Sequence, residues 1–249
     1  MIKRLLSRAV PEHEWPVWVL PLAILASFLL SGLIFYATYF GPGIKDLQGI
    51  SYRPTDDAAR VKVEVGGTLF AVPAHFTRNG QTRRGIELTH AELHALLPDF
   101  LPWQKDLAEE LLRTDGQAPL ITITLRGMAR AIPEAQIFTA LYKPYLNGPG
   151  RVRDDGLQAF SFKSDSPYGQ KQIFRALSTG AQENRNKAPI FICDLPEAPN
   201  PTCESRFDIG NTAQASYRFK RVHLSNWAET DQRIKDLIRN FRAAARRVN

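Results

Sequence analysis

The chain has 249 residues, an ordinary apolar content and a formal net charge of +7, which suits one globular domain with an appendage. The positive charge is concentrated at one end, where residues 233–249 carry six basic side chains against Asp236 alone. Because a nucleic-acid-binding surface spreads Lys and Arg along the path of the phosphates, this distribution argues against nucleic acid as a partner.

The first predicted element is a membrane-spanning helix over residues 16–40. This run contains no charged side chain, and a helix of that length exceeds the roughly 30 Å of a bilayer's hydrocarbon core. Trp15 and Trp18 lie at one end of the run, and Tyr36 and Tyr39 lie at the other. Spanning helices place amphipathic aromatic residues at both headgroup levels, so we expect the lipid bilayer to be the partner of this segment.

A cleaved secretory signal is the alternative for the same segment. A signal peptide has an apolar region of about 7–15 residues followed by a small-residue cleavage site. The apolar run here is longer, and the sequence Tyr-Phe-Gly-Pro-Gly at its end is a poor cleavage site. We therefore predict an uncleaved, single-pass anchor.

The distribution of basic residues predicts the orientation of this helix. Basic residues stand before the span and at a distance after it: Lys3, Arg4, Arg8, Lys45 and Arg53. The positive-inside rule favours residues 1–15 in the cytoplasm, so the remainder of the chain would lie in the periplasm. The outer region also has no Asn-x-Ser/Thr acceptor without an intervening proline, which favours a bacterial inner membrane over a secretory lumen.

Residues 41–60 are predicted to be a linker, because glycine and proline end the helical pattern and no apolar period follows. The folded domain is predicted to occupy residues 61–249. Its first strand begins at Val61, where valine alternates with charged residues in VKVEV. The glycine pair at 66–67 turns the chain into a second strand, which Pro73 places at a sheet edge or a bulge.

Asn79-Gly80 predicts a two-residue hairpin turn. The segment that follows is predicted to be helical, because Thr89 and Glu92 have the spacing of a capping box.

His90 and His94 would then share one helix face, at an i, i+4 spacing that can present two imidazoles to one metal ion. The zincin pattern needs glutamate directly after the first histidine, and Ala91 takes that position. An ordinary polar helix face is the simpler interpretation, and we predict no cofactor and no metal.

The second half of the chain is rich in strands. A helix is predicted over about residues 105–113, and strands are predicted in PLITITLRG, PIFICDL and ASYRFKRVHL. The last element is an amphipathic helix that Ser225 can cap, with an apolar stripe of Trp227, Ile234, Leu237, Ile238 and Phe241. These elements predict an α+β domain with a mainly antiparallel sheet, inserted helices and a C-terminal amphipathic helix.

Cys193 and Cys203 are the only cysteines, and a proline-rich stretch separates them. A disulfide that joins two neighbouring strands across this loop would stabilise the fold by roughly 2–3 kcal/mol. Paired cysteines also suit an oxidising compartment. Two unrelated buried thiols are the alternative.

A candidate partner-contact strip lies within residues 142–155. It combines a flexible turn with Tyr142, Tyr145, Arg151 and Arg153, and tyrosine and arginine often carry the binding energy of protein interfaces. An ordinary exposed loop is the other interpretation of this strip.

The sequence contains no nucleophile elbow, P-loop or dinucleotide-binding glycine pattern. The first hypothesis is therefore a non-enzymatic module, anchored in the membrane, that contacts another envelope protein or assembly. The second is an anchored immunity or inhibitor protein that neutralises a toxic enzyme in the same compartment. The third is an envelope hydrolase whose site is assembled from residues far apart in the sequence.

Overall fold

The computed structural model describes residues 16, 18–39, 53–85, 87–130, 132–177 and 188–247. The chain divides into two units, residues 1–48 and residues 49–249, and each is described by itself. The predicted N-terminal segment 1–15 and most of the predicted linker lie outside the described residues.

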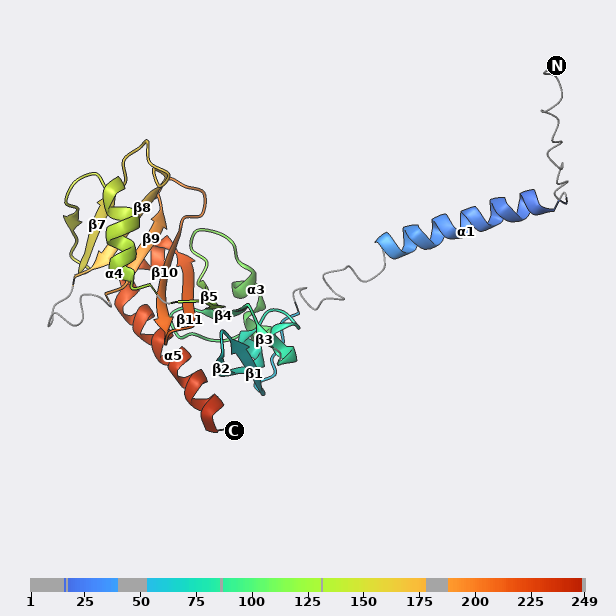
Figure 1. The fold of residues 1–249 in the computed structure, drawn as a ribbon, viewed down its shortest axis with the longest axis horizontal. Helices are drawn as coiled ribbons and strands as arrows, with labels where there is room; N and C mark the ends of the chain where they lie inside the picture. The colour runs from blue at the N-terminus through green and yellow to red at the C-terminus, as the bar shows by residue number, and fades with distance from the viewer. Residues whose placement is uncertain are drawn as a thin grey trace, which may run out of the picture. The chain divides into compact units, whose positions relative to one another are not determined.

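The first unit contains helix α1 (Val19–Tyr39), drawn in blue in Figure 1. It has no acidic residue in its first turn and no basic residue in its last. By length and composition it can cross a membrane. The predicted apolar helix at the N-terminus is therefore confirmed as a helix.

The second unit is built on an eight-stranded antiparallel sheet (Figure 1), whose strand order is β4-β5-β11-β10-β9-β8-β7-β6. Its strands are β4 (His90–Leu96), β5 (Leu120–Gly127), β6 (Arg151–Val152), β7 (Leu157–Ser161), β8 (Lys171–Ala176), β9 (Ile190–Asp194), β10 (Thr202–Ile209) and β11 (Ala213–Lys220). A smaller sheet has the order β2-β1-β3, with β1 (Arg60–Val65), β2 (Thr68–Pro73) and β3 (Glu87–Leu88). Among the strands of the described residues, β3 alone runs parallel to its neighbour, β1. The predicted α+β class with a mainly antiparallel sheet is confirmed.

Helical segments connect and cover these strands. The short ones are η1 (Ala74–Phe76), η2 (Thr82–Arg84), η3 (Lys105–Leu107), α3 (Ala108–Leu112) and η7 (Arg221–Asn226). Three consecutive helical turns, α4 (Glu134–Ile137), η4 (Phe138–Tyr142) and η5 (Lys143–Tyr145), form what we call the 134–145 segment. The last element is α5 (Trp227–Arg247). The predicted cap Ser225 lies inside η7, so α5 begins one residue later than the sequence indicated.

Helix α5 buries the main core against the sheets. Ile234, Ile238 and Phe241 are buried, and Trp227 and Leu237 pack partly buried against the same cluster, so the predicted apolar stripe is confirmed. The Trp227 indole Nε1 donates to the Asp155 carbonyl at 2.8 Å. These contacts join α5 to the loop before β7, as well as to the strands beneath it.

A second, smaller core lies under the 134–145 segment. Phe138 and Tyr142 pack there with Phe160, Ile173 and Ile190. The strands β7, β8 and β9 therefore carry buried apolar residues on both faces.

Three local predictions were wrong. His90 begins strand β4 instead of a capped helix, because this segment pairs with β5 along its whole length. The predicted hairpin turn at Asn79-Gly80 does not form; the Asn79 side chain accepts hydrogen bonds from the backbone N and Oγ1 of Thr82, both at 2.9 Å. The predicted strand ASYRFKRVHL ends at Lys220, because Arg221–Asn226 form η7, and no strand was predicted where β10 lies.

Candidate functional site

The face of the large sheet that points away from α5 is covered only in part. Successive residues of a strand point to opposite faces. In β11, Tyr217 and Phe219 are buried in the core with α5, whereas Ser216 is half-buried and Arg218 is exposed. The 134–145 segment covers this second face over β8 and β9. Over β5, β11 and β10 the second face is partly exposed, and we call this region the open face.

The open face consists of rows of polar residues in register across the strands. In one row Thr122, Arg218 and Glu204 stand side by side on β5, β11 and β10. In the neighbouring row the corresponding residues are Thr124, Ser216 and Arg206. The open face is therefore polar and is built on strands whose other face packs in the core.

A depression of about 460 Å³ lies where the open face meets the 134–145 segment. Its apolar wall is formed by Tyr142, Tyr168, Ile190 and Ile192. Its charged wall is formed by Glu134, Lys171, Glu204, Arg206 and Arg218. We call this feature the sheet depression.

The charges around the sheet depression are paired. The Arg206 guanidinium contacts the Glu134 carboxylate across 72 residues of sequence. Arg218 Nη2 lies 2.7 Å from Glu204 Oε2, and Lys171 pairs with Asp194. Burial raises the pKa of Glu134, and the neighbouring Arg206 opposes that rise. Because an unpaired buried charge is costly, Arg206 and Glu134 hold each other in place.

A second depression, of about 600 Å³, lies beside α5. Phe207, Ile209 and Ile238 contribute apolar surface, and basic residues of α5 form one side. Glu134 and Arg206 line both depressions. Their ion pair is therefore the ridge between the two, and we call the second feature the helix groove.

The lining of the sheet depression combines paired charges with aromatic and apolar side chains. Its described lining contains neither histidine nor cysteine, and two of its carboxylates are paired with guanidiniums. A central arginine with aromatic and apolar neighbours is a typical arrangement of a protein-binding hot spot. This arrangement is suited to receiving a side chain of a partner protein.

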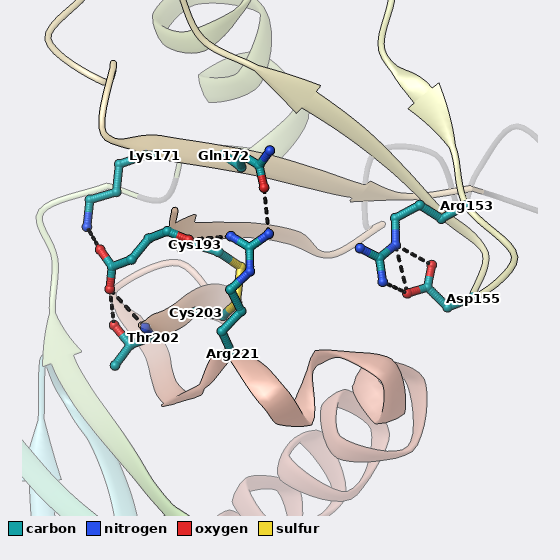
Figure 2. The surroundings of a disulfide bond; sticks show 9 residues. Arg153, Asp155, Lys171, Gln172, Cys193, Thr202, Cys203 and Arg221 are labelled. Carbon is teal, nitrogen blue, oxygen red and sulfur yellow. Dashed lines mark hydrogen bonds and ion pairs between the residues drawn. A yellow bond between two sulfur atoms is a disulfide. The ribbon is translucent and has the colours of Figure 1, made fainter. Parts of the chain in front are cut away.

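The disulfide lies behind this site and joins two of its strands (Figure 2). Cys193 and Cys203 are bonded and stand directly opposite each other on β9 and β10, with their Cα atoms 4.0 Å apart. Around them, the Asp194 carboxylate accepts hydrogen bonds from both the backbone N and Oγ1 of Thr202, at 2.9 and 2.8 Å. Arg221 donates to the Asp194 carbonyl and to the Gln172 side chain. The disulfide and these hydrogen bonds therefore hold together β9 and β10, the strands that carry Ile192, Glu204 and Arg206.

The structure divides the predicted strip of Tyr142, Tyr145, Arg151 and Arg153. Tyr142 is only 5% exposed, because it packs in the second core, and it lines the sheet depression. Tyr145 is 39% exposed and packs edge-on against Tyr168.

The two arginines of the strip lie elsewhere. Arg151 is exposed on β6. Arg153 pairs with Asp155 at 2.7 Å (Figure 2) and lies over the ring of Phe174, which belongs to the core with α5. The four residues therefore do not form one patch, and Tyr145 is the member that a partner can reach next to the sheet depression.

The two histidines of the weak metal hypothesis are far apart. Four residues of a strand span about 13 Å, so His90 and His94 on β4 cannot share one ion as they would on a helix. His90 is exposed beside the Thr89 hydroxyl. His94 is buried, with Nε2 3.3 Å from Arg78 Nη1, which donates to it. Within the described residues no cluster of three or more potential ligands is present.

The predicted membrane-interface residues are described in part. Trp18, just before α1, is 61% exposed, and Tyr36 is 63% exposed. Trp15 and the side chain of Tyr39 lie outside what the structure describes.

Comparison with known proteins supplies one fold relative. No protein-family model and no curated protein sequence matches the chain. The structure is similar to an immunity protein of the Stenotrophomonas maltophilia type IV secretion system, with a TM-score of 0.56 and 16% sequence identity. The match covers 76% of this chain and 97% of that one. At this identity the likeness is one of fold.

The sequence-based reasoning missed the residues at the centre of the site. Arg206, Glu134 and Arg218 were not singled out, because no strand was predicted where β10 lies and Glu134 comes from a distant part of the chain. The one available signal was the alternation of TCESRFDI, in which Cys203, Ser205 and Ile209 turn inward.

Proposed function

We propose that this chain is a membrane-anchored immunity protein, which binds a toxic enzyme in the periplasm and blocks it without catalysis of its own. The fold supports this proposal most directly, because it resembles an immunity protein over 97% of that protein's length. The open face, with the ridge of Arg206 and Glu134, is the surface that would contact the enzyme.

The N-terminal helix supports the anchored arrangement. Helix α1 is long and apolar enough to cross a bilayer, and the basic residues before it favour a cytoplasmic N-terminus. The disulfide between Cys193 and Cys203 suits an oxidising compartment. These features agree with a folded domain held at the periplasmic side of the inner membrane, where it would meet an enzyme that attacks the envelope.

The paired charges of the site support inhibition by binding. Arginine is enriched among residues that dominate interface energies, and a shielded central position strengthens such contacts. Arg206 is partly buried and central, whereas Arg218 is exposed at the rim. We therefore expect Arg206 to contribute more binding energy than Arg218.

A cell-survival experiment tests the function. Enzymes that the same organism secretes are directed singly to the periplasm of a sensitive host, with and without the full-length chain. We expect survival to be restored against one of them, and the purified pair to form a stoichiometric complex. Protection against none of the enzymes, together with stoichiometric recovery in a resident envelope assembly, would overturn the proposal in favour of an accessory module.

A paired substitution tests the surface. Removing Arg206 alone would leave the half-buried Glu134 without its partner, so the variant is Arg206→Met with Glu134→Gln. We expect the affinity for the enzyme against which the chain protects to fall by at least tenfold, with the fold retained. The control is Arg84→Gln, an exposed residue of η2 away from both depressions, which should bind as the wild type does. Equal binding by variant and wild type would exclude the ridge from the interface.

A further inference from the structure

Four basic residues form a stripe along one side of α5. Lys235, Arg239, Arg242 and Arg246 follow one another at spacings of four, three and four residues, which places them on the same side of a helix. The first three line the helix groove. Arg242 and Arg246 also line a smaller hollow of about 250 Å³ beside Leu69.

The stripe carries unbalanced positive charge toward its C-terminal end. Lys235 pairs with Asp231 at 2.6 Å, and Arg239 pairs with Asp236 at 2.8 Å. Among the described parts of the chain, Arg242 and Arg246 have no hydrogen-bond or ion-pair partner. Two adjacent guanidiniums are therefore available to an external anion.

The helix dipole accounts for Arg246, which lies in the last turn of α5, but not for Arg242. Its stabilising effect on cations is confined to the last turn, and α5 continues to Arg247. Arg242 lies more than one turn before that end, and it is half-buried between the two hollows. A position shared by two concave sites is suited to ligand contact.

The groove also offers apolar surface beside the cations. Ile209 and Ile238 are buried in its floor, and Phe207 is partly exposed beneath Lys235, whose Nζ lies 5.7 Å from the ring centroid. A ligand that fits therefore combines negative charge with apolar groups. A concave groove of this kind suits a protein segment better than a flat bilayer surface.

We infer that the helix groove receives an acidic segment of the toxic enzyme, with carboxylates against Arg242 and Arg246 and apolar side chains over Phe207. This inference rests on the proposed function and names the chemistry of the partner at a second part of the surface. The ridge of Arg206 and Glu134 adjoins the groove, so one partner can occupy both sides of it.

The test compares charge variants of the full-length chain, held in phosphatidylcholine nanodiscs. Arg242→Glu with Arg246→Glu reverses the stripe, and Arg242→Gln with Arg246→Gln neutralises it with less risk to the helix. The control, Arg84→Glu with Lys105→Glu, changes the net charge equally at exposed positions that line neither depression. Circular dichroism and thermal melting establish that each variant is folded.

Affinity for the enzyme identified by the survival experiment is then measured at 50 and 200 mM NaCl. We expect at least tenfold weaker binding for the reversed stripe, a smaller loss for the neutral one and a change within twofold for the control. Salt should weaken wild-type binding more than binding by the reversed variant. If the reversed variant binds the enzyme as tightly as the wild type does, the inference is overturned and the immunity function still stands.

A defined probe distinguishes failure of the proposed immunity function from failure of the inference about the helix groove. If the wild type binds no enzyme, poly-L-glutamate is titrated instead; binding that is lost in the reversed variant and kept in the control supports an acid-binding groove. Equal binding by all variants overturns it. The inference is also overturned if the stripe variants differ from wild type only on phosphatidylglycerol nanodiscs, because the groove would then be a membrane contact.

Discussion

The two faces of the eight-stranded sheet are made by the same strands and yet differ in composition and cover. The face toward α5 carries buried aromatic and aliphatic residues, in which the Phe191 ring makes edge contacts with Tyr217, Phe219 and Trp227. The open face carries threonine, serine and paired charges, such as Arg218 with Glu204. Because strand residues alternate between faces, stability and recognition can be assigned to different residues of one strand. Substitutions on the open face should therefore alter binding with little effect on folding.

His94 is the exception that tests this division most strongly. His94 is one of the polar residues of β4, but residues of η1 and of the turn after η1 cover its side chain, which is buried. Burial, together with the nearby Arg78 guanidinium, lowers the pKa of His94 to about 3. The neutral ring is therefore the form that the fold accepts.

We predict that His94 makes the fold sensitive to acid. In the unfolded chain the histidine pKa is about 6.5, so the folded-state pKa is depressed. The resulting stability is fully present above pH 6.5 and is lost as the pH falls toward 3, at about 1.4 kcal/mol per pH unit, or on the order of 5 kcal/mol in all.

Urea unfolding of the full chain in mild detergent at pH 7, 5 and 3.5 measures this effect. We expect the pH dependence to be flatter for His94→Gln than for wild type across that interval, because both chains share all other titrating groups. Parallel curves for the two proteins would show that His94 does not hold its proton-free form in the folded state.

The second prediction contrasts one residue from each face. Phe191→Ala removes a fully buried ring from the α5 side and should cost about 3–5 kcal/mol of the free energy of unfolding, as large-to-small core changes do. Thr124→Ala on the open face should change it by less than about 0.5 kcal/mol. Chemical denaturation of both variants measures the difference, and similar losses would mean that the open face is packed against something.

The third prediction concerns the disulfide that braces β9 and β10. Cys193→Ala with Cys203→Ala should lower the free energy of unfolding by roughly 2–3 kcal/mol, because the unfolded chain gains the entropy of an open ten-residue loop. Thiol titration of the denatured, unreduced wild type should detect no free thiol. Two reactive thiols, or an unchanged unfolding midpoint in the variant, would contradict the bridge in the native protein.

Local patterns in the sequence determined those parts of the structure whose energy is itself local or compositional. The uncharged run from residue 16 onward forms α1 because an unbroken apolar helix needs no tertiary partner to satisfy its backbone. Val61 and Val63 predicted β1 through their alternation, and Pro73 predicted the edge position of β2. The stripe through Ile234 and Ile238 predicted the buried side of α5 because its helical period directly reports one-sided burial.

Tertiary structure decided the features that depend on pairing between distant segments. His90–Leu96 has residues that suit a helix, yet register with β5 makes it a strand, because a full ladder outweighs a weak local preference. The site itself depends on Glu134 meeting Arg206 from 72 residues away. No local sequence pattern around either residue predicts this contact, because it forms only where the 134–145 segment crosses the sheet.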